Sequence, residues 1–411
     1  MASTVILGSG IIGVSTAYYL SQHQPGSTIH LVDSSPELFA SASGYAGGFL
    51  ARDWFPASLV PLAELSYELH KTLADKEGGR EKWSYAKSVT VSYDPKGERT
   101  DGKRGEDWLL AGTSRAGLVQ DRKREIKHDE IPPWLKRLDG DAVSLVDDGE
   151  GTAVLDPLKL CEFLLAKCQT AGVNLHYPAT PISVGTNTHG ELASLRIACS
   201  NSLTETDIPA TRLLIASGSW SPQVLASLFK TSRVKIPIQS LAGHSIVFKN
   251  PGEVGDTSHS LYCSLDDYAP EIYFRPNGDI YVAGLNSSTI SLPKLAVGSV
   301  QLEDHLDELK KTAKWLIHSD KELQVVRTGL CFRPVTPRGI PYITRLSDKD
   351  LGHGIRTKPG HEGGVFVAAG HGPWGISLSL GSGMVMAEMM QGREVSADVS
   401  TLGWQELVPK L

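Results

Sequence analysis

Three glycines near the start of the chain have the spacing of a phosphate-binding turn. An apolar run at residues 5–7 leads into Gly8-x-Gly10-x-x-Gly13, and a stretch compatible with a helix follows at residues 14–21. Gly8 lets the chain turn sharply, Gly10 leaves room for a pyrophosphate beside the backbone, and Gly13 lets the helix lie close to the sheet. The N-terminus of that helix would offer unpaired N–H groups and partial positive charge to the phosphates.

A carboxylate completes this pattern. A second apolar run at residues 28–32 ends in Asp33, at about the 20-residue spacing from the last glycine that dinucleotide-binding folds use. There a carboxylate can accept hydrogen bonds from a ribose. A purely structural turn is the alternative, because glycine-rich turns are common, but strand, helix and acid together favour a dinucleotide site. The motif does not separate FAD from NAD.

The surrounding elements indicate a doubly wound α/β domain. Helices and apolar strands alternate up to about residue 85, and the pattern returns at Val154. Asp156 is a natural N-cap and Pro157 suits the first position of the helix that follows. A continuous apolar run at residues 212–216 predicts a strand that is buried on both faces.

Residues 236–293 differ, because their apolar residues alternate with period two. Such stretches at 245–248, 271–274 and 279–282 predict an antiparallel sheet, with a hairpin turn at 276–279. A helix is expected at residues 302–317. This second domain is inserted into the first, a topology that some flavoenzymes have and nicotinamide dehydrogenases usually lack. The expected division is 1–85, 145–235 and 325–411 for the first domain, and 86–144 and 236–324 for the second.

Composition narrows the class of protein. The 411 residues carry a net charge of −6, which gives no basic face for nucleic acid. No apolar run reaches the roughly 18 residues that span a bilayer. The five cysteines lack ligand spacing, so no metal site or disulfide framework is expected and a cytoplasmic protein is favoured.

The two ends of the chain and one internal stretch bear on targeting and on surface exposure. The N-terminus coincides with the first predicted strand, so no signal peptide is expected. The last residues, Pro409-Lys410-Leu411, are close to a peroxisomal address but differ from it at the first position. Residues 94–133 are rich in charge and indicate a solvated surface excursion.

Five segments, in order, resemble one family. They are the glycine motif with Asp33, a run of small residues at 41–50, a strand ending in Ala-x-Gly-x-Trp at 214–221, the segment 328–343 with Arg333-Pro334, and the glycine-rich segment 365–383. Together they resemble the FAD-dependent amino-acid and amine oxidoreductases, such as glycine oxidase, D-amino acid oxidase and monomeric sarcosine oxidase. Some fungal members with a segment like residues 47–50 have no settled substrate.

The resemblance implies a Rossmann-type FAD-binding domain of the glutathione reductase kind, with an interleaved α+β substrate domain. FAD is expected to be noncovalent, because Cys331 precedes the arginine rather than standing at the attachment position of sarcosine oxidase. A helix beginning near Gly375 would point its N-terminus at the flavin. The expected cofactor-binding residues are Gly8, Gly10, Ile11, Ile12, Gly13, Asp33, Ser34, Ser41, Ala42, Ser43, Gly44, Ala46, Gly47, Gly48, Phe49, Leu50, Pro181, Ile182, Ala216, Ser217, Gly218, Trp220, Arg333, Gly370, His371, Gly372, Pro373, Trp374, Gly375 and Ile376.

Four residues are expected to act on the substrate. Arg333 matches the family arginine that grips the substrate carboxylate, for which a guanidinium gives a planar two-pronged fit. Tyr273 matches a tyrosine that lines the pocket, and His371 and Trp374 lie in the loop facing the flavin ring. The alternatives are a structural ion pair for Arg333, a packed sheet residue for Tyr273 and a helix cap for His371.

The resemblance implies oxidation of the C–N bond of a small amino acid or amine. A hydride would pass from the carbon next to a neutral amine to flavin N5, the imine would be hydrolysed, and the electrons would pass to oxygen, giving hydrogen peroxide, or to another acceptor. Val282 is placed at the position of the oxygen-activating lysine of sarcosine oxidases, which keeps a dehydrogenase open. Arg338 stands where the family usually has Asp.

Two other functions stay open at this stage. The same fold supports FAD-dependent 2-hydroxy-acid dehydrogenases. A flavoprotein with a mainly binding or trafficking role is the third interpretation. The expected partner is a small-molecule substrate, with neither nucleic acid nor a transmembrane segment, and the expected oligomeric state is a monomer or weak dimer.

Overall fold

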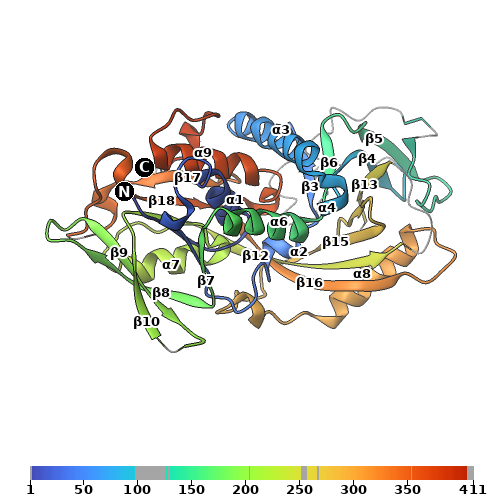
Figure 1. The fold of residues 1–411 in the computed structure, drawn as a ribbon. Helices are drawn as coiled ribbons and strands as arrows, with labels where there is room; N and C mark the ends of the chain where they lie inside the picture. Colours follow the sequence, from blue (N-terminus) through green and yellow to red (C-terminus); the bar gives the residue numbers. More distant parts are fainter. Residues whose placement is uncertain are drawn as a thin grey trace, which may run out of the picture.

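The protein is described by a computed structural model that covers residues 2–97, 126–127, 130–202, 204–250, 257–265, 268–352 and 354–404. Two sheets organise the chain, a six-stranded one on the left of Figure 1 and a nine-stranded one on the right. Most of the charged stretch 94–133 and the whole C-terminal tripeptide lie outside the described residues.

The six-stranded sheet forms the core of the first domain. Its order is β17-β18-β11-β1-β2-β7, and every neighbouring pair is parallel except β17 with β18. The strands are β1 (Thr4–Leu7), β2 (Ile29–Val32), β7 (Asn174–His176), β11 (Arg212–Ile215), β17 (Tyr342–Leu346) and β18 (Gly364–Ala369). The apolar runs predicted as buried strands are thus β1, β2 and β11, and these three lie side by side.

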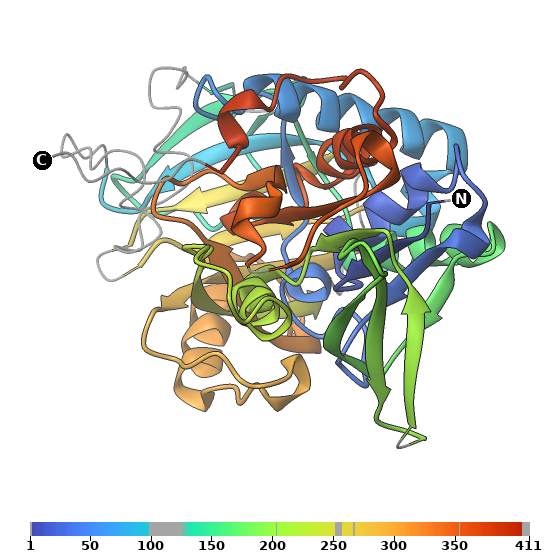
Figure 2. The same ribbon diagram turned by 90° about the vertical axis from the view of Figure 1, so that its left-hand side faces the viewer.

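Helices cover one face of this sheet, and a small sheet covers the other (Figures 1 and 2). The helices are α1 (Ile11–Leu20), α3 (Val60–Glu77), α6 (Pro157–Thr170) and α9 (Ser379–Gln391). The opposite face packs on α7 (Ser221–Leu228) and on the strands β8 (Ala179–Thr186), β9 (Leu192–Cys199) and β10 (Thr204–Pro209). Asp156 caps α6 as predicted, because its carboxylate accepts from the N–H groups of Leu158 and Lys159. The doubly wound α/β fold is confirmed.

The nine-stranded sheet contains the strands expected for the second domain, together with two short strands from segments expected in the first. Its order is β16-β12-β15-β14-β13-β4-β6-β3, with β5 beside β4. The strands are β3 (Phe49–Ala51), β4 (Ala86–Asp94), β5 (Ala142–Asp147), β6 (Thr152–Val154), β12 (Gln239–Lys249), β13 (Ser258–Cys263), β14 (Glu271–Phe274), β15 (Asp279–Ser287) and β16 (Gln324–Val335). Helix α8 (Glu303–Leu316) packs on one face. The predicted hairpin joins β14 to β15, where Gly278 has a φ of 81°.

Three expectations need correction. The second sheet is mixed rather than antiparallel, because β4 and β13 pair in parallel. Strand β16 pairs with β12, so the chain returns to the first sheet only at β17, later than the expected residue 325. No helix begins at Gly375, because a 3-10 turn occupies Gly372–Trp374 and α9 begins at Ser379. Among the described residues, no helix combines the length and apolarity that a membrane span requires.

Candidate functional site

The glycine motif forms a turn that no larger residue could make. Gly8 has a φ of 102°, and a Cβ there would lie 2.6 Å from the carbonyl oxygen of Ala216. A Cβ on Gly13 would clash with the carbonyl oxygen of Gly8, so this glycine lets α1 lie close to β1. At Gly10 a Cβ would come within 2.9 Å of Ser43 Oγ. The turn is therefore compact, and α1 begins next to a side-chain hydroxyl.

Polar groups converge on this turn from two other segments. The N–H of Ile11 donates to Ser43 Oγ at 2.9 Å. The Asp33 carboxylate accepts from the N–H groups of Ser9 at 2.8 Å and Ser35 at 2.9 Å. Burial raises the pKa of Asp33, and these two hydrogen bonds oppose that rise. The other N–H groups in the first turn of α1 have no acceptor within the helix, so they can bind an anion.

A cavity of about 490 Å³ opens over this turn and runs to the nine-stranded sheet. Its walls come from the segments that follow the carboxyl ends of β1, β2, β11 and β18, which is where open α/β sheets bind ligands. The predicted residues that line it are Gly8, Gly10, Ile11, Ile12, Asp33, Ser34, Ser41, Ala42, Ser43, Ala46, Gly47, Pro181, Ala216, Ser217, Gly218, Trp220, Arg333, His371, Gly372, Pro373, Gly375 and Ile376.

Other predicted residues lie outside the cavity lining. They are Gly13, Gly44, Gly48, Phe49, Leu50, Ile182, Tyr273, Gly370 and Trp374. Several of these have a packing role instead: a Cβ on Gly48 would clash with the carbonyl oxygen of Leu155, and Gly370 faces Thr336. Ile182 is 39% exposed. The resemblance and the small-residue composition signalled these positions, but neither distinguishes contact with a ligand from contact with neighbouring chain.

Arg333 lies half-buried on β16 and lines the cavity. Its Nη1 donates to Oδ1 of Asn286 at 2.6 Å. The guanidinium lies over Gly243 on β12, where any Cβ would clash with Nη1. Among the described residues, no carboxylate forms an ion pair with Arg333. The expected alternative, a structural ion pair, is therefore not what holds this side chain.

Tyr273 does not line the cavity, contrary to expectation. It is fully buried on β14, its hydroxyl is 2.8 Å from Oε2 of Glu271, and its ring packs behind Gly47. The tyrosine that reaches the cavity is Tyr281 on β15, whose ring stacks on that of Tyr273 with centroids 5.6 Å apart. The physical reason is strand order, because β15 lies nearer than β14 to the strands that carry Gly243 and Arg333.

His371 and Trp374 differ in their surroundings. His371 lines the cavity, and its Nε2 lies 3.0 Å from Oγ of Ser382, with which it shares a hydrogen bond. Burial lowers the pKa of His371 to about 3, so the ring is neutral at physiological pH. Trp374 is outside the lining, and its ring packs on Phe55 with centroids 4.7 Å apart.

Val282 also departs from its expected place. Its side chain is buried on the α8 side of the sheet, whereas its neighbour Tyr281 faces the cavity. Successive residues of a strand point to opposite faces of the sheet. Residue 282, expected to match the oxygen-activating lysine, therefore faces away from the cavity. Cys331 does line the cavity, two residues before Arg333.

One wall of the cavity had no sequence signal. Lys294, Leu295 and Ala296 belong to the loop between β15 and α8, and they line the cavity mouth. The indole N–H of Trp220 donates to the carbonyl oxygen of Pro293 at 2.8 Å and so ties this loop to the first domain. Period-two patterning identified the strands but carried no information about where the loop between them would lie.

Comparison with known proteins agrees with this geometry. Residues 3–389 match the family described as FAD dependent oxidoreductase. The chain belongs to this family. This FAD-dependent oxidoreductase is 26% identical over 418 residues to C1F5.03c of Schizosaccharomyces pombe, an oxidoreductase by name, and the match covers 97% of this chain and 96% of that protein.

Solved structures show the same fold. Glycine oxidase from Geobacillus kaustophilus superposes with a TM-score of 0.72 at 17% identity and covers 98% of both chains. L-proline dehydrogenase from P. horikoshii gives a TM-score of 0.72 at 16% identity, over 98% of this chain and 96% of that one. Both likenesses establish the architecture of this FAD-dependent oxidoreductase and leave its substrate to be argued from the site.

The cavity suits the cofactor of the family. We propose that Gly8, Gly10 and the N-terminus of α1 hold the pyrophosphate, because this turn excludes a Cβ and presents N–H groups. Asp33 would accept from the adenosine ribose, since each of its oxygens accepts one hydrogen bond from the chain and can accept another. Ala46 and Gly47 would lie along the flat ring, and a Cβ on Gly47 would clash with the ring of Tyr273 behind it.

Proposed function

We propose that this FAD-dependent oxidoreductase oxidises the C–N bond of a small amino acid or of an amine that carries a carboxylate. The observation that carries the proposal is Arg333, a half-buried cation in the cofactor cavity with an amide as its partner and, among the described residues, no carboxylate. A guanidinium can bind a carboxylate through two parallel hydrogen bonds. The solved neighbours named above both act on amino acids by name, which supports an amine over a hydroxy acid.

The residues of the cavity fit a reaction that depends on orientation. Arg333 would fix the substrate by its carboxylate, and the Tyr281 ring would bound the space beside it. When bound, FAD supplies the two-electron acceptor for a hydride that leaves the carbon next to the nitrogen. Positioning of this kind accounts for a large part of the acceleration in many enzymes. The imine product would react with water to give a carbonyl compound and the free amine or ammonia.

The charges of the lining support a substrate that arrives as its neutral amine. The carboxylates among the described lining residues are Asp33 and Glu37, and both follow β2, beside the turn assigned to the adenosine half of the cofactor. His371 is neutral and its Nε2 is shared with Ser382. At the Arg333 end the described lining therefore offers no carboxylate to compete for the guanidinium, and none to serve as a base.

Anaerobic reduction of the flavin tests the proposal. The purified holoprotein would be mixed with glycine, sarcosine, both enantiomers of alanine and proline, and separately with glycolate and lactate, while absorbance at roughly 450 nm is followed. We expect an amino acid to bleach the flavin, and air to restore the colour if oxygen is the acceptor. Bleaching by hydroxy acids alone would replace the proposal with a 2-hydroxy-acid dehydrogenase. If no compound bleaches the flavin, the binding or trafficking role gains support.

A further inference from the structure

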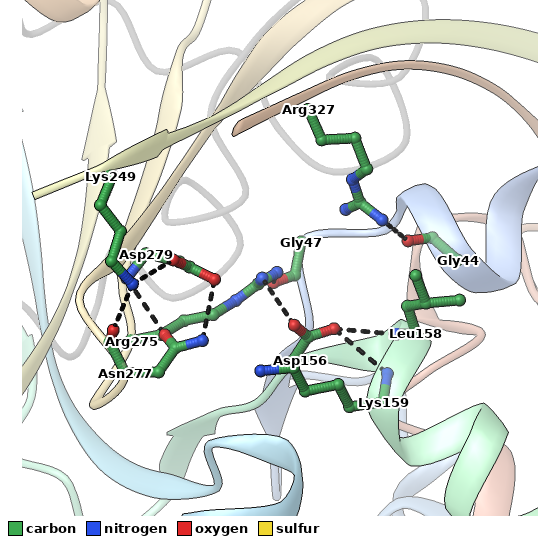
Figure 3. A network of polar contacts seen from close by, with 10 residues as sticks. All are labelled: Gly44, Gly47, Asp156, Leu158, Lys159, Lys249, Arg275, Asn277, Asp279 and Arg327. Carbon is green, nitrogen blue, oxygen red and sulfur yellow. Dashed lines mark hydrogen bonds and ion pairs between the residues drawn. The ribbon is translucent and has the colours of Figure 1, made fainter. Parts of the chain in front are cut away.

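The flavin-side segment Ser41–Gly47 is held by the other domain. It contributes five residues to the cavity lining and contains the short helix α2 (Ala42–Tyr45). Two of its carbonyl oxygens accept hydrogen bonds from arginines, one on β16 and one in the hairpin between β14 and β15. Nη1 of Arg327 donates to the carbonyl of Gly44 at 2.6 Å, and Nη2 of Arg275 donates to that of Gly47 at 2.9 Å (Figure 3). The contacts lie at the middle and at the C-terminal end of the segment.

Arg275 is a buried cation with an opposite charge from the first domain. Only 2% of the residue is exposed, and Nη1 lies 3.7 Å from Oδ2 of Asp156, the residue that caps α6. The guanidinium also lies 5.8 Å from the ring centre of Tyr281. Arg275 thus contacts two cavity-lining residues, Gly47 and Tyr281, and one helix cap, without itself lining the cavity.

The hairpin between β14 and β15 fixes the backbone of Arg275. Its N–H donates to the carbonyl of Asp279, and its carbonyl accepts from the N–H of Gly278, both at 2.9 Å. Lys249 braces the same turn through the carbonyl of Asn277 at 2.7 Å and Oδ1 of Asp279 at 3.0 Å (Figure 3). The side chain therefore projects from a rigid base toward Gly47.

Burial of this charge is poorly explained by stability alone. Removing two ions from water costs several kcal/mol each, and an apolar replacement of a buried pair is often neutral or stabilising. Nε of Arg275 is buried and has no hydrogen-bond partner among the described residues, so the guanidinium is not fully satisfied. What the arginine does provide is a directional donor at one carbonyl oxygen of the flavin-side segment.

We propose that Arg275 and Arg327 are positioning residues for the cofactor, which hold Ser41–Gly47 in its FAD-binding shape from the substrate domain. Arg327 contributes through the carbonyl of Gly44 and through the face of the Tyr45 ring, 5.3 Å from its guanidinium carbon. Retention of FAD then depends on the docking of the two domains. The proposal rests on FAD binding and is independent of which substrate is oxidised.

The test measures FAD release from the full-length holoprotein by the fluorescence of the freed cofactor. The variants are Arg275→Met, Arg275→Lys and Arg327→Met. The matched control is Arg212→Met. Arg212 is also buried, donates to the carbonyl of Met390 at 2.7 Å and has an unpartnered Nε, but it lies at the far end of β11 from the cavity.

We expect FAD release to be at least tenfold faster in Arg275→Met and Arg327→Met, partly restored in Arg275→Lys, and unchanged in Arg212→Met even where the latter melts earlier. Hydrogen exchange of the peptide covering residues 41–48 should accelerate in the same variants. Unchanged release and exchange in Arg327→Met, whose donor is only partly buried, would overturn the proposal even if Arg275→Met fails to fold. A loss of FAD in Arg212→Met equal to that in Arg275→Met would also overturn it.

Discussion

Arg333 and Asn286 form a charged donor and neutral acceptor pair at the edge of the cofactor cavity, with Nη1 of the arginine 2.6 Å from Oδ1 of the asparagine. A neutral amide orients a guanidinium without cancelling its charge, so the cation keeps its attraction for an anion. A carboxylate at the same place would satisfy the arginine internally. The identity of residue 286 therefore matters to what Arg333 can bind.

Asn286→Asp should weaken substrate binding by placing a carboxylate on Arg333. We expect KM for a carboxylate substrate to rise at least tenfold, which corresponds to about 1.4 kcal/mol, while kcat changes less. Steady-state kinetics with the substrate found by flavin bleaching measure this effect. Asn286→Ala is the control, because it frees the guanidinium without adding charge. An equal rise in KM for both variants would contradict the electrostatic explanation.

Gly243→Ala should displace the arginine sterically. A Cβ at residue 243 would clash with Nη1 of Arg333, although the backbone there has no positive φ that would add strain. We expect KM to rise by a factor of roughly 10 or more, with little change in thermal stability, because the far end of a flexible side chain can move aside. Gly298→Ala is the control, since the nearest heavy atom there is 3.5 Å away. Wild-type KM in Gly243→Ala would show that Arg333 does not act from its observed position.

Gly13→Ala should abolish FAD binding without any contact to the cofactor. Its Cβ would clash with the carbonyl oxygen of Gly8, which is backbone and cannot move without opening the turn. The purified variant should carry less than about a tenth of the FAD of the wild type, measured by absorbance, since the turn that presents the N–H groups is lost. Full FAD content in a folded Gly13→Ala variant would be inconsistent with the assigned pyrophosphate site.

Local sterics explain why the sequence revealed so much of the nucleotide site. Gly13 avoids a clash with the carbonyl oxygen of Gly8 in the same βα unit, whereas Gly8 avoids one with Ala216, which is far away in sequence. The Gly13 constraint is short-range, and the spacing of the motif with its flanking strand and helix identifies both glycines without knowledge of the fold. The strand at residues 212–215 was likewise predictable, because burial on both faces leaves a continuous apolar run.

The residues at the Arg333 end of the cavity are brought together by contacts between segments far apart in sequence. The spacing of residues along the chain does not predict such contacts. Tyr273 and Tyr281 are directly opposite each other in the β14–β15 register, so both project from the same face. Only the order of the strands decides which one reaches the cavity. The prediction for Val282 was wrong because successive residues of a strand point to opposite faces, and Val282 points to the α8 side. Arg275 and Asp156 are 119 residues apart (275 − 156) and meet only in the folded chain.

Acid should destabilise the protein through buried histidines. Burial lowers the pKa of His70 to about 4, although its hydrogen bond to the carbonyl of Ile376 opposes the shift. The unfolded chain, with a histidine pKa near 6.5, then binds more protons than the folded one between about pH 6.5 and pH 4. The stabilisation is complete above pH 6.5 and is lost as the pH falls, by up to roughly 3 kcal/mol for this residue.

Urea unfolding between pH 4 and pH 8 checks this dependence. His70→Gln retains a donor for the Ile376 carbonyl but has no proton to gain, so its free energy of unfolding should fall less steeply below pH 6.5. The exposed His189 gives the matched control, and His189→Gln should follow the wild type. A His70→Gln curve parallel to that of the wild type would show that another group carries the acid sensitivity.

The most direct measurement of the central claim is the binding of an unreactive carboxylate beside the flavin. Benzoate would be titrated into the holoprotein and followed by the change in the flavin absorption spectrum, with benzamide as the uncharged comparison. Loss of a two-pronged contact with Arg333 costs about 3 kcal/mol, which is on the order of a hundredfold in Kd. We predict that Arg333→Met raises the Kd of benzoate by about this factor and leaves that of benzamide and the FAD content unchanged. Equal benzoate affinity in wild type and variant would contradict a carboxylate-binding role for Arg333.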